Sequence, residues 1–136
     1  MDTAIFTVAY ANIGTSPDGG STFSLPRIVG SRKALELTLL PDRLSANEAK
    51  DLHMINWVVP AADLEARSEA LVQRLANGPT RAHALAKRLI AHTFDTSMET
   101  QLAAEVKGFA DCASGPDFKE GVTAFVEKRK PTFIGH

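Results

Sequence analysis

A predominantly helical α/β protein is the fold class that this 136-residue sequence predicts. Two short segments rich in β-branched and aromatic residues, 4–10 and 54–59, indicate strands. From residue 63 onward, apolar residues recur at three- and four-residue steps, which indicates a series of amphipathic helices. Because two strands alone make a poor sheet, the pattern predicts part of a fold whose sheet is completed by other strands.

The first half of the chain is organised around a loop rich in glycine and proline, which break periodic structure. Ser45 and Glu48 have the spacing of a capping box, in which each side chain bonds to the backbone N–H of the other residue. The expected elements are, in order, a strand at 4–10, the loop at 14–21, a helix at 25–29 interrupted by Pro26, a helix at 31–40 after Gly30, a helix from Ser45 to about Leu52, and a strand at 54–59.

The second half predicts four amphipathic helices separated by glycine, proline and asparagine. Thr96 and Glu99 have the spacing of a further capping box at the start of the third helix. The apolar stripes are Leu64, Leu71, Val72 and Leu75; Ala82, Leu85, Ala86, Leu89, Ile90 and Thr93; Met98, Leu102, Val106 and Phe109; and Phe118, Val122, Phe125 and Val126. We therefore divide the chain at residue 60, into segments 1–60 and 61–136.

Composition excludes several classes of function. A formal net charge of −1, with few aromatic residues near basic ones, is unlike a nucleic-acid-binding protein. No apolar run approaches the roughly 20 residues of a membrane span, and the N-terminus does not resemble a signal peptide. Cys112, the single cysteine, cannot form an internal disulfide, and no residues have metal-ligand spacing. We expect a reduced, cytoplasmic protein without nucleic-acid or membrane partners.

Several motifs in register resemble the enoyl-CoA hydratase/isomerase (crotonase) superfamily. They lie at residues 13–22, 25–30, 34–37, 42–49, 56–60 and 120–129, in the order and spacing of the family, and the resemblance covers essentially the whole chain. Members of that superfamily are roughly twice this length, and the resemblance is to their second half. It implies a partial crotonase-like β-β-α spiral, with the end of the spiral core and its glycine loop in 1–60 and a helical region for oligomerisation and CoA contact in 61–136.

The resemblance also implies proton transfer on an acyl-CoA thioester whose enolate is held in an oxyanion hole mostly absent from this chain. Family hydratases use two glutamates, and Tyr10 stands where the second would be. Asp18, in a Pro-Asp-Gly setting, resembles the proton-shuttling aspartate of isomerase-like branches, including epoxyphenylacetyl-CoA isomerases. One carboxylate suffices for such a shift, which favours a Δ3-Δ2 isomerase with Asp18 as catalytic residue. The alternative interpretation of Asp18 is an ordinary turn residue.

Further substrate-binding residues follow from the same resemblance, each with a structural alternative. Gly19 and Gly20 would allow the backbone to approach the acyl group, or would simply permit a strained loop. The resemblance places Pro17 with them as a substrate-binding residue, or it belongs to an ordinary Pro-Asp-Gly turn. Tyr10 would line the acyl pocket or pack within the fold. Phe109 and Lys128 would hold the adenine and phosphates of CoA, or Lys128 would be a solvated helix end. His53 stands where relatives carry a helix-ending glycine, which indicates either a residue that tolerates left-handed backbone geometry or a locally altered turn.

No metal site and no cofactor are expected, because CoA enters only as part of the acyl-CoA substrate. The family resemblance implies a homo-oligomer, either a trimer or a dimer of trimers. The alternative function is a truncated, catalytically inactive segment that retains only the self-association surface of the family.

Overall fold

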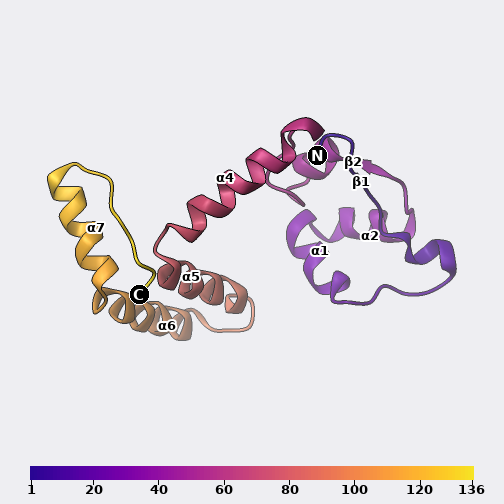
Figure 1. Ribbon diagram of the computed structural model, residues 1–136. Coiled ribbons are helices and arrows are strands. Elements are labelled where there is room, and N and C mark those ends of the chain that lie inside the picture. Colours follow the sequence, from indigo (N-terminus) through magenta and orange to yellow (C-terminus); the bar gives the residue numbers. More distant parts are fainter. The chain divides into compact units, whose positions relative to one another are not determined.

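A computed structural model describes residues 1–136, in which helices predominate (Figure 1). The chain divides into two units, Met1–Arg67 and Ser68–His136. The elements in order are β1 (Ile5–Phe6), η1 (Ala9–Ile13), α1 (Ser21–Val29), α2 (Ser31–Leu39), β2 (Leu44–Ser45), α3 (Ala46–Asp51), η2 (Ala61–Asp63), α4 (Leu64–Ala76), α5 (Thr80–His92), α6 (Met98–Ala113) and α7 (Pro116–Glu127), where η denotes a 3-10 helix.

The two expected strands are largely wrong. Only Ile5 and Phe6 of the segment 4–10 are extended, and they pair antiparallel with β2, which the sequence did not indicate. The chain then winds into η1 because Gly14, at φ 71°, closes it with a bond from its N–H to the carbonyl of Ala11. Segment 54–59 forms no ladder, because only Val59 in it bonds to the N-terminal segment, through the N–H of Asp2.

The helical expectations fare better in the first unit. Gly30, at φ 77°, separates α1 from α2, and these two helices pack against each other. However, α1 begins four residues earlier than expected and contains Pro26 within it rather than being interrupted. The capping box is confirmed, since the N–H of Ser45 donates to Glu48 Oε2 at 2.7 Å and the N–H of Glu48 donates to Ser45 Oγ at 3.2 Å.

The four helices expected within residues 61–136 form, with one correction at a cap. The side chain that caps α6 is Ser97, which accepts a bond from the N–H of Thr100 at 3.2 Å, and not Thr96. Helix α6 packs against both α5 and α7. At the first contact Gly108 is buried, and a Cβ there would lie 3.7 Å from Leu89 Cδ1. This distance is an ordinary van der Waals contact, so Gly108 marks the place where α6 packs against Leu89 of α5.

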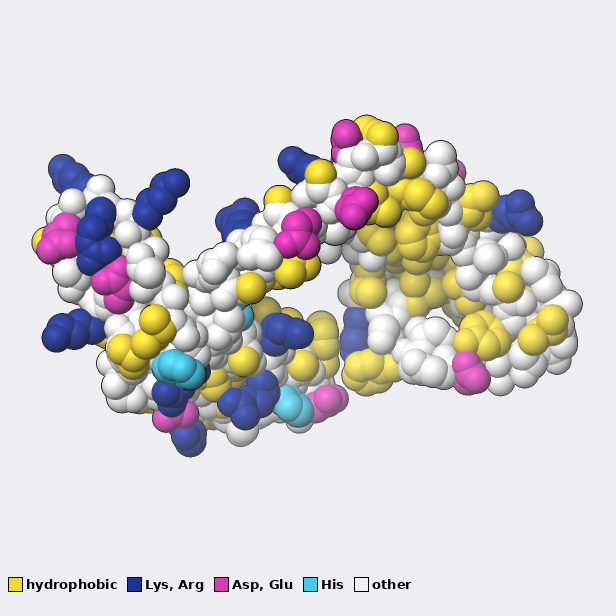
Figure 2. Space-filling model, in the orientation of Figure 1, with side chains coloured by type: hydrophobic (Ala, Val, Ile, Leu, Met, Phe, Trp, Pro, Cys, Tyr) yellow, Lys and Arg dark blue, Asp and Glu magenta, His cyan; other side chains and the backbone are white.

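The buried core is small in both units. The buried apolar residues are Ala34, Leu37, Ala46, Ala49 and Ala124, and no large side chain is fully buried. Many large hydrophobic side chains are instead exposed, and Figure 2 shows groups of them on the visible face of the unit formed by residues 1–67. The apolar stripes that the sequence predicts thus exist on the helices but are only partly covered.

Candidate functional site

The candidate site is a glycine loop, defined here as residues 14–20, between η1 and α1. Gly14 ends η1 in the left-handed region, and the N–H of Thr15 donates to the carbonyl of Tyr10 at 3.2 Å. At the other end of the loop, Gly19 and Gly20 have φ values of 61° and 81°. Such angles favour glycine. The three glycines therefore let the chain reverse within a few residues between the two helices.

Tyr10 and Asp18 meet across this loop. The Tyr10 hydroxyl donates to Asp18 Oδ1 at 2.6 Å, a short bond of the kind made to a charged acceptor. This bond to the carboxylate raises the pKa of Tyr10 above its ordinary value of 10.0. The phenol therefore stays protonated near neutral pH and remains a donor. Sequence reasoning selected both residues but gave no indication that they form a pair.

The backbone of Asp18 is held as well as its side chain. Its carbonyl accepts bonds from the N–H of Ser21 at 3.2 Å and from Ser21 Oγ at 2.9 Å, at the start of α1. Pro17, half-buried, precedes it and restricts the backbone. Asp18 is thus fixed by the helix start on one side and by Tyr10 on the other.

Part of the Asp18 carboxylate remains available. A carboxylate offers about four lone-pair positions, and the protein supplies one side-chain donor, to Oδ1. Asp18 is exposed, and a Cβ built on Gly19 or Gly20 would meet no atom within 4 Å. The neighbouring glycines are thus unobstructed, and the exposed carboxylate keeps Oδ2 without a protein donor, so that Oδ2 can accept a proton from an incoming molecule.

The two residues proposed for CoA contact lie apart from each other within the second unit. The exposed ring of Phe109 packs edge-on against Phe118, with centroids 5.9 Å apart. Lys128, at φ 56°, is the left-handed cap at the opposite end of α7, and its N–H bonds to the carbonyls of Ala124 and Phe125. Ten residues of helix separate Phe118 from Lys128, about 15 Å. The structure does not bring Phe109 and Lys128 into contact.

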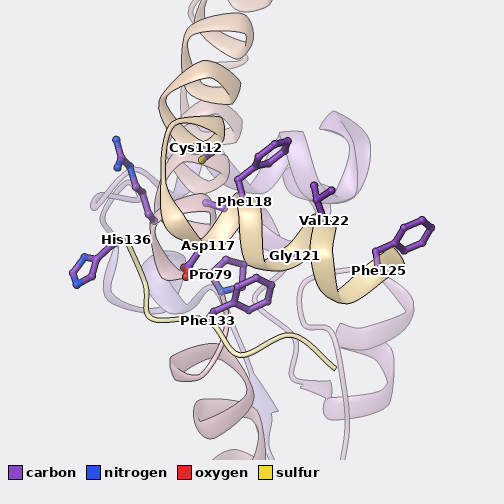
Figure 3. A pocket seen from close by; sticks show the side chains of 11 residues that line it. Pro79, Cys112, Asp117, Phe118, Gly121, Val122, Phe125, Phe133 and His136 are labelled. Carbon is purple, nitrogen blue, oxygen red and sulfur yellow. The ribbon is translucent and has the colours of Figure 1, made fainter. Parts of the chain in front are cut away.

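A second feature, not anticipated from the sequence, is an apolar groove of about 400 Å³ in the second unit (Figure 3). Phe118, Val122 and Phe125 project from α7, while the Phe133 ring lies against the backbone of Gly121, 3.6 Å from the position of a Cβ there. The complete lining is Pro79, Arg81, Ala82, Cys112, Asp117, Phe118, Gly121, Val122, Phe125, Phe133 and His136.

The groove depends on the C-terminal segment, residues 129–136, which returns along α7. Asp117, only 7% exposed, accepts bonds from the N–H groups of Ile134 and Gly135 at 2.8 and 2.9 Å. One turn further on, Glu120 binds the Arg129 guanidinium at 2.6 and 2.8 Å, which lowers the pKa of Glu120 to about 2. These long-range bonds leave no local signal in the sequence.

Two further observations concern the chain as a whole. No group of three or more His, Cys, Asp or Glu side chains lies close enough together to hold a metal ion. No helix combines the length and the apolar character needed to cross a membrane.

His53 has a left-handed backbone, at φ 59°, which is one of the two outcomes that its position indicated.

Comparison with known proteins supports the motif-based resemblance. The chain is 37% identical over 132 residues to a Rhodobacter capsulatus protein named "Probable enoyl-CoA hydratase", which covers 97% of this chain and 51% of that protein. It is 36% identical to the 1,2-epoxyphenylacetyl-CoA isomerase of Escherichia coli, covering 97% of this chain and 50% of the isomerase. The chain therefore spans about half the length of the curated relatives it matches.

The fold agrees with these relationships. The crystal structure of an enoyl-CoA hydratase from Bacillus anthracis superimposes with a TM-score of 0.90 at 32% identity, over 99% of this chain and 52% of the hydratase. The fold is therefore crotonase-like, in a mostly helical form. The family model for enoyl-CoA hydratase/isomerase matches residues 1–136. The chain thus belongs to the enoyl-CoA hydratase/isomerase family, within the crotonase superfamily.

Proposed function

We propose that the chain takes part in a Δ3-Δ2 isomerisation of an unsaturated acyl-CoA thioester, with Asp18 as the group that carries the proton. The observation that carries this proposal is the exposed Asp18 carboxylate in the glycine loop, held at Oδ1 by Tyr10 and open at Oδ2. The family membership supplies the substrate class, and the E. coli relative is named as an acyl-CoA isomerase.

The proposed reaction needs only one base. Asp18 Oδ2 takes a proton from the carbon next to the thioester carbonyl, the electron pair of that C–H bond moves into a dienolate, and the thioester oxygen gains negative charge. The same Asp18 then returns the proton to the far end of the dienolate, so that the double bond shifts and no atom is gained or lost. Developing charge on the thioester oxygen requires preorganised donors, and because the family resemblance implies an oxyanion hole mostly absent from this chain, donors outside the chain would have to complete it.

Hydration is the competing reaction in this family, and the site favours it less. Adding water requires one group to activate the water and another to protonate the neighbouring carbon. The glycine loop offers one carboxylate, and the residue paired with it is Tyr10, a donor whose raised pKa keeps its proton in place. A single carboxylate with a fixed donor suits a proton shift better than the addition of water.

The test is a turnover assay with the chain of residues 1–136. A 3-enoyl-CoA is supplied, and the appearance of the conjugated 2-enoyl-CoA is followed by absorbance and by chromatography. The proposal expects turnover by the parent chain, its loss in Asp18→Asn, and its retention in Asp42→Asn, an exposed carboxylate in the same unit. A well-folded chain without turnover would refute the proposal and favour a function in self-association alone.

Self-association is a second proposed property, supported by the exposed area. Two separate domains, each with half of the chain's 14.6 kDa, would together expose about 8,300 Å². The chain exposes 10227 Å², an excess of roughly 1,900 Å² over that value. Stable interfaces typically cover about 800 Å² on each partner. The excess is therefore large enough for an extensive interface.

The surface that would be covered includes apolar stripes on two helices of the second unit. On α6 the exposed residues include Met98 and Val106, and on α7 they include Phe125 and Val126. Sedimentation of the purified chain alone should show an oligomer, with the mass of three or six chains expected from the family resemblance. A monomer at micromolar concentration would contradict this second proposal.

A further inference from the structure

Tyr10 differs from a packed tyrosine in what its hydroxyl contacts. Its ring is half-buried, whereas its hydroxyl donates to Asp18 Oδ1 at 2.6 Å, on the exposed side chain of the glycine loop. We infer that Tyr10 is a positioning residue that fixes the Asp18 carboxylate, so that Oδ2 alone exchanges a proton with the substrate. This inference rests on the proposed function, because it assigns the role of Tyr10 within the same reaction.

The geometry limits how the Asp18 side chain can move. Ser21 holds its backbone carbonyl through two hydrogen bonds, and Tyr10 holds one of its two carboxylate oxygens. Rotation about the Cβ–Cγ bond would break the bond to Tyr10. The two oxygens are therefore not equivalent, because Oδ1 has a protein donor and Oδ2 has none.

The bond from Tyr10 can persist through both proton transfers. When Oδ2 carries the proton, Oδ1 becomes the carbonyl oxygen of a neutral acid, which still accepts a hydrogen bond. Tyr10 keeps its own proton throughout and does not exchange it with substrate. Its contribution is orientation of the base, which speeds the chemical step without adding a contact to the acyl chain.

An alternative role for Tyr10, lining the acyl pocket, predicts a different kinetic result. Loss of a pocket contact raises KM, whereas loss of positioning lowers kcat. With the isomerisation assay, Tyr10→Phe should lower kcat by about tenfold or more, as expected for losing a hydrogen bond to a charged group, and change KM by less than about twofold. Unchanged kcat, or an effect confined to KM, would overturn the inference.

The control variant is Thr7→Val, which removes an exposed hydroxyl outside the glycine loop that donates to the carbonyl of Pro41 at 3.1 Å. It should retain parental kcat and KM. The double variant Tyr10→Phe with Asp18→Asn should be no slower than Asp18→Asn alone, because Tyr10 acts only through that carboxylate. If the double variant instead loses kcat by the product of the two single-variant factors, Tyr10 has an independent role and the inference is refuted.

A spectroscopic measurement distinguishes failure of this inference from failure of the proposed function. Tyr10 is the only tyrosine in the chain, so ultraviolet absorbance of tyrosinate reports it alone. The pKa of Tyr10 should lie above 10.0 in the parent chain and fall in Asp18→Asn, because the carboxylate raises it. If the pKa of Tyr10 is the same in both chains, Tyr10 and Asp18 are not paired. If the pKa differs as expected but the parent chain shows no turnover, the hydrogen bond is supported, whereas the reaction and the positioning role are refuted.

Discussion

Asp18 and Asp117 are two carboxylates in opposite situations. Asp117 is almost entirely buried, and each of its oxygens accepts a backbone N–H from the C-terminal segment. Asp18 is exposed, and only one of its oxygens has a protein donor. Both anchor a turn of the chain, yet only Asp18 keeps an oxygen free for another molecule.

This difference separates a structural carboxylate from one suited to chemistry. A buried acceptor with all of its partners in place stabilises the fold, and removing it leaves backbone N–H groups without partners. An exposed acceptor with one partner adds little stability but can take up a proton. Burial and hydrogen-bond occupancy, rather than residue type, therefore assign the two roles.

The largest expected effect is on activity, in Asp18→Asn. Removing the proton carrier should lower kcat by about 100-fold to 10,000-fold, the usual contribution of a general base. The free energy of unfolding should change by less than about 0.5 kcal/mol because the residue is exposed. Steady-state kinetics and urea unfolding measure the two quantities. If Asp18→Asn lowered the free energy of unfolding as much as Asp117→Asn is expected to, the distinction between the two carboxylates would be contradicted.

The same substitution at Asp117 should have the reverse result. Asparagine presents an amide donor to one of the two N–H groups, so the free energy of unfolding should fall by about 2 kcal/mol. Isomerisation by the folded fraction should stay near the parental rate. Urea unfolding beside Asp18→Asn provides the comparison, and a D117N chain as stable as the parent would show that the C-terminal segment is not held in solution.

Two glycines with nearly equal backbone angles extend the comparison with a smaller effect. Gly20 and Gly135 have φ values of 81° and 83°, but a Cβ on Gly20 meets nothing, while one on Gly135 lies 2.5 Å from Thr80 Oγ1. Gly20→Ala should cost about 1 kcal/mol from backbone strain alone. Gly135→Ala should cost more, by thermal or urea unfolding, because Thr80 must also move. Equal losses would contradict this difference in packing.

The smallest effect concerns pH and Glu120. Arg129 and the N–H of Thr132 lower the pKa of Glu120 to about 2 in the folded chain, below its ordinary value of 4.5. The stabilisation is therefore present above about pH 5 and is lost as pH falls toward 2. Glu120→Gln should flatten this part of the stability curve, as measured by urea unfolding between pH 2 and 6. An unchanged acid dependence would show that other groups account for it.

The sequence predicted elements whose determinants are local. The Ser45–Glu48 cap depends on a spacing of three residues, and the helices depend on apolar periodicity, so the cap and the presence of the helices were correct, although α1 begins earlier than expected. Strand pairing is not local, which is why β2 at Leu44–Ser45 was missed. The composition of segment 54–59 favours a strand, but no strand forms there because the segment has no neighbouring strand to pair with.

The candidate site was predicted only in part, because the contacts between its residues are not determined locally. Motif resemblance selected Tyr10 and Asp18 separately, but the bond between them depends on how the glycine loop turns. The hydrogen bonds that hold the C-terminal segment join Asp117 to residues 17 and 18 positions away, beyond any local pattern. The roles of Phe109 and Lys128 in CoA binding stay predictions.

The most direct test of the central claim is product analysis of the reaction in D₂O. With a 3-enoyl-CoA, the parent chain should yield 2-enoyl-CoA containing less than one deuterium per molecule. In a fraction of the turnovers, the single carboxylate returns the same proton that it removed before this proton exchanges with solvent. Asp18→Asn should yield none of this product, and mass spectrometry with NMR measures both. Formation of a 3-hydroxyacyl-CoA in place of the 2-enoyl product, or undiminished isomerisation by Asp18→Asn, would contradict the account.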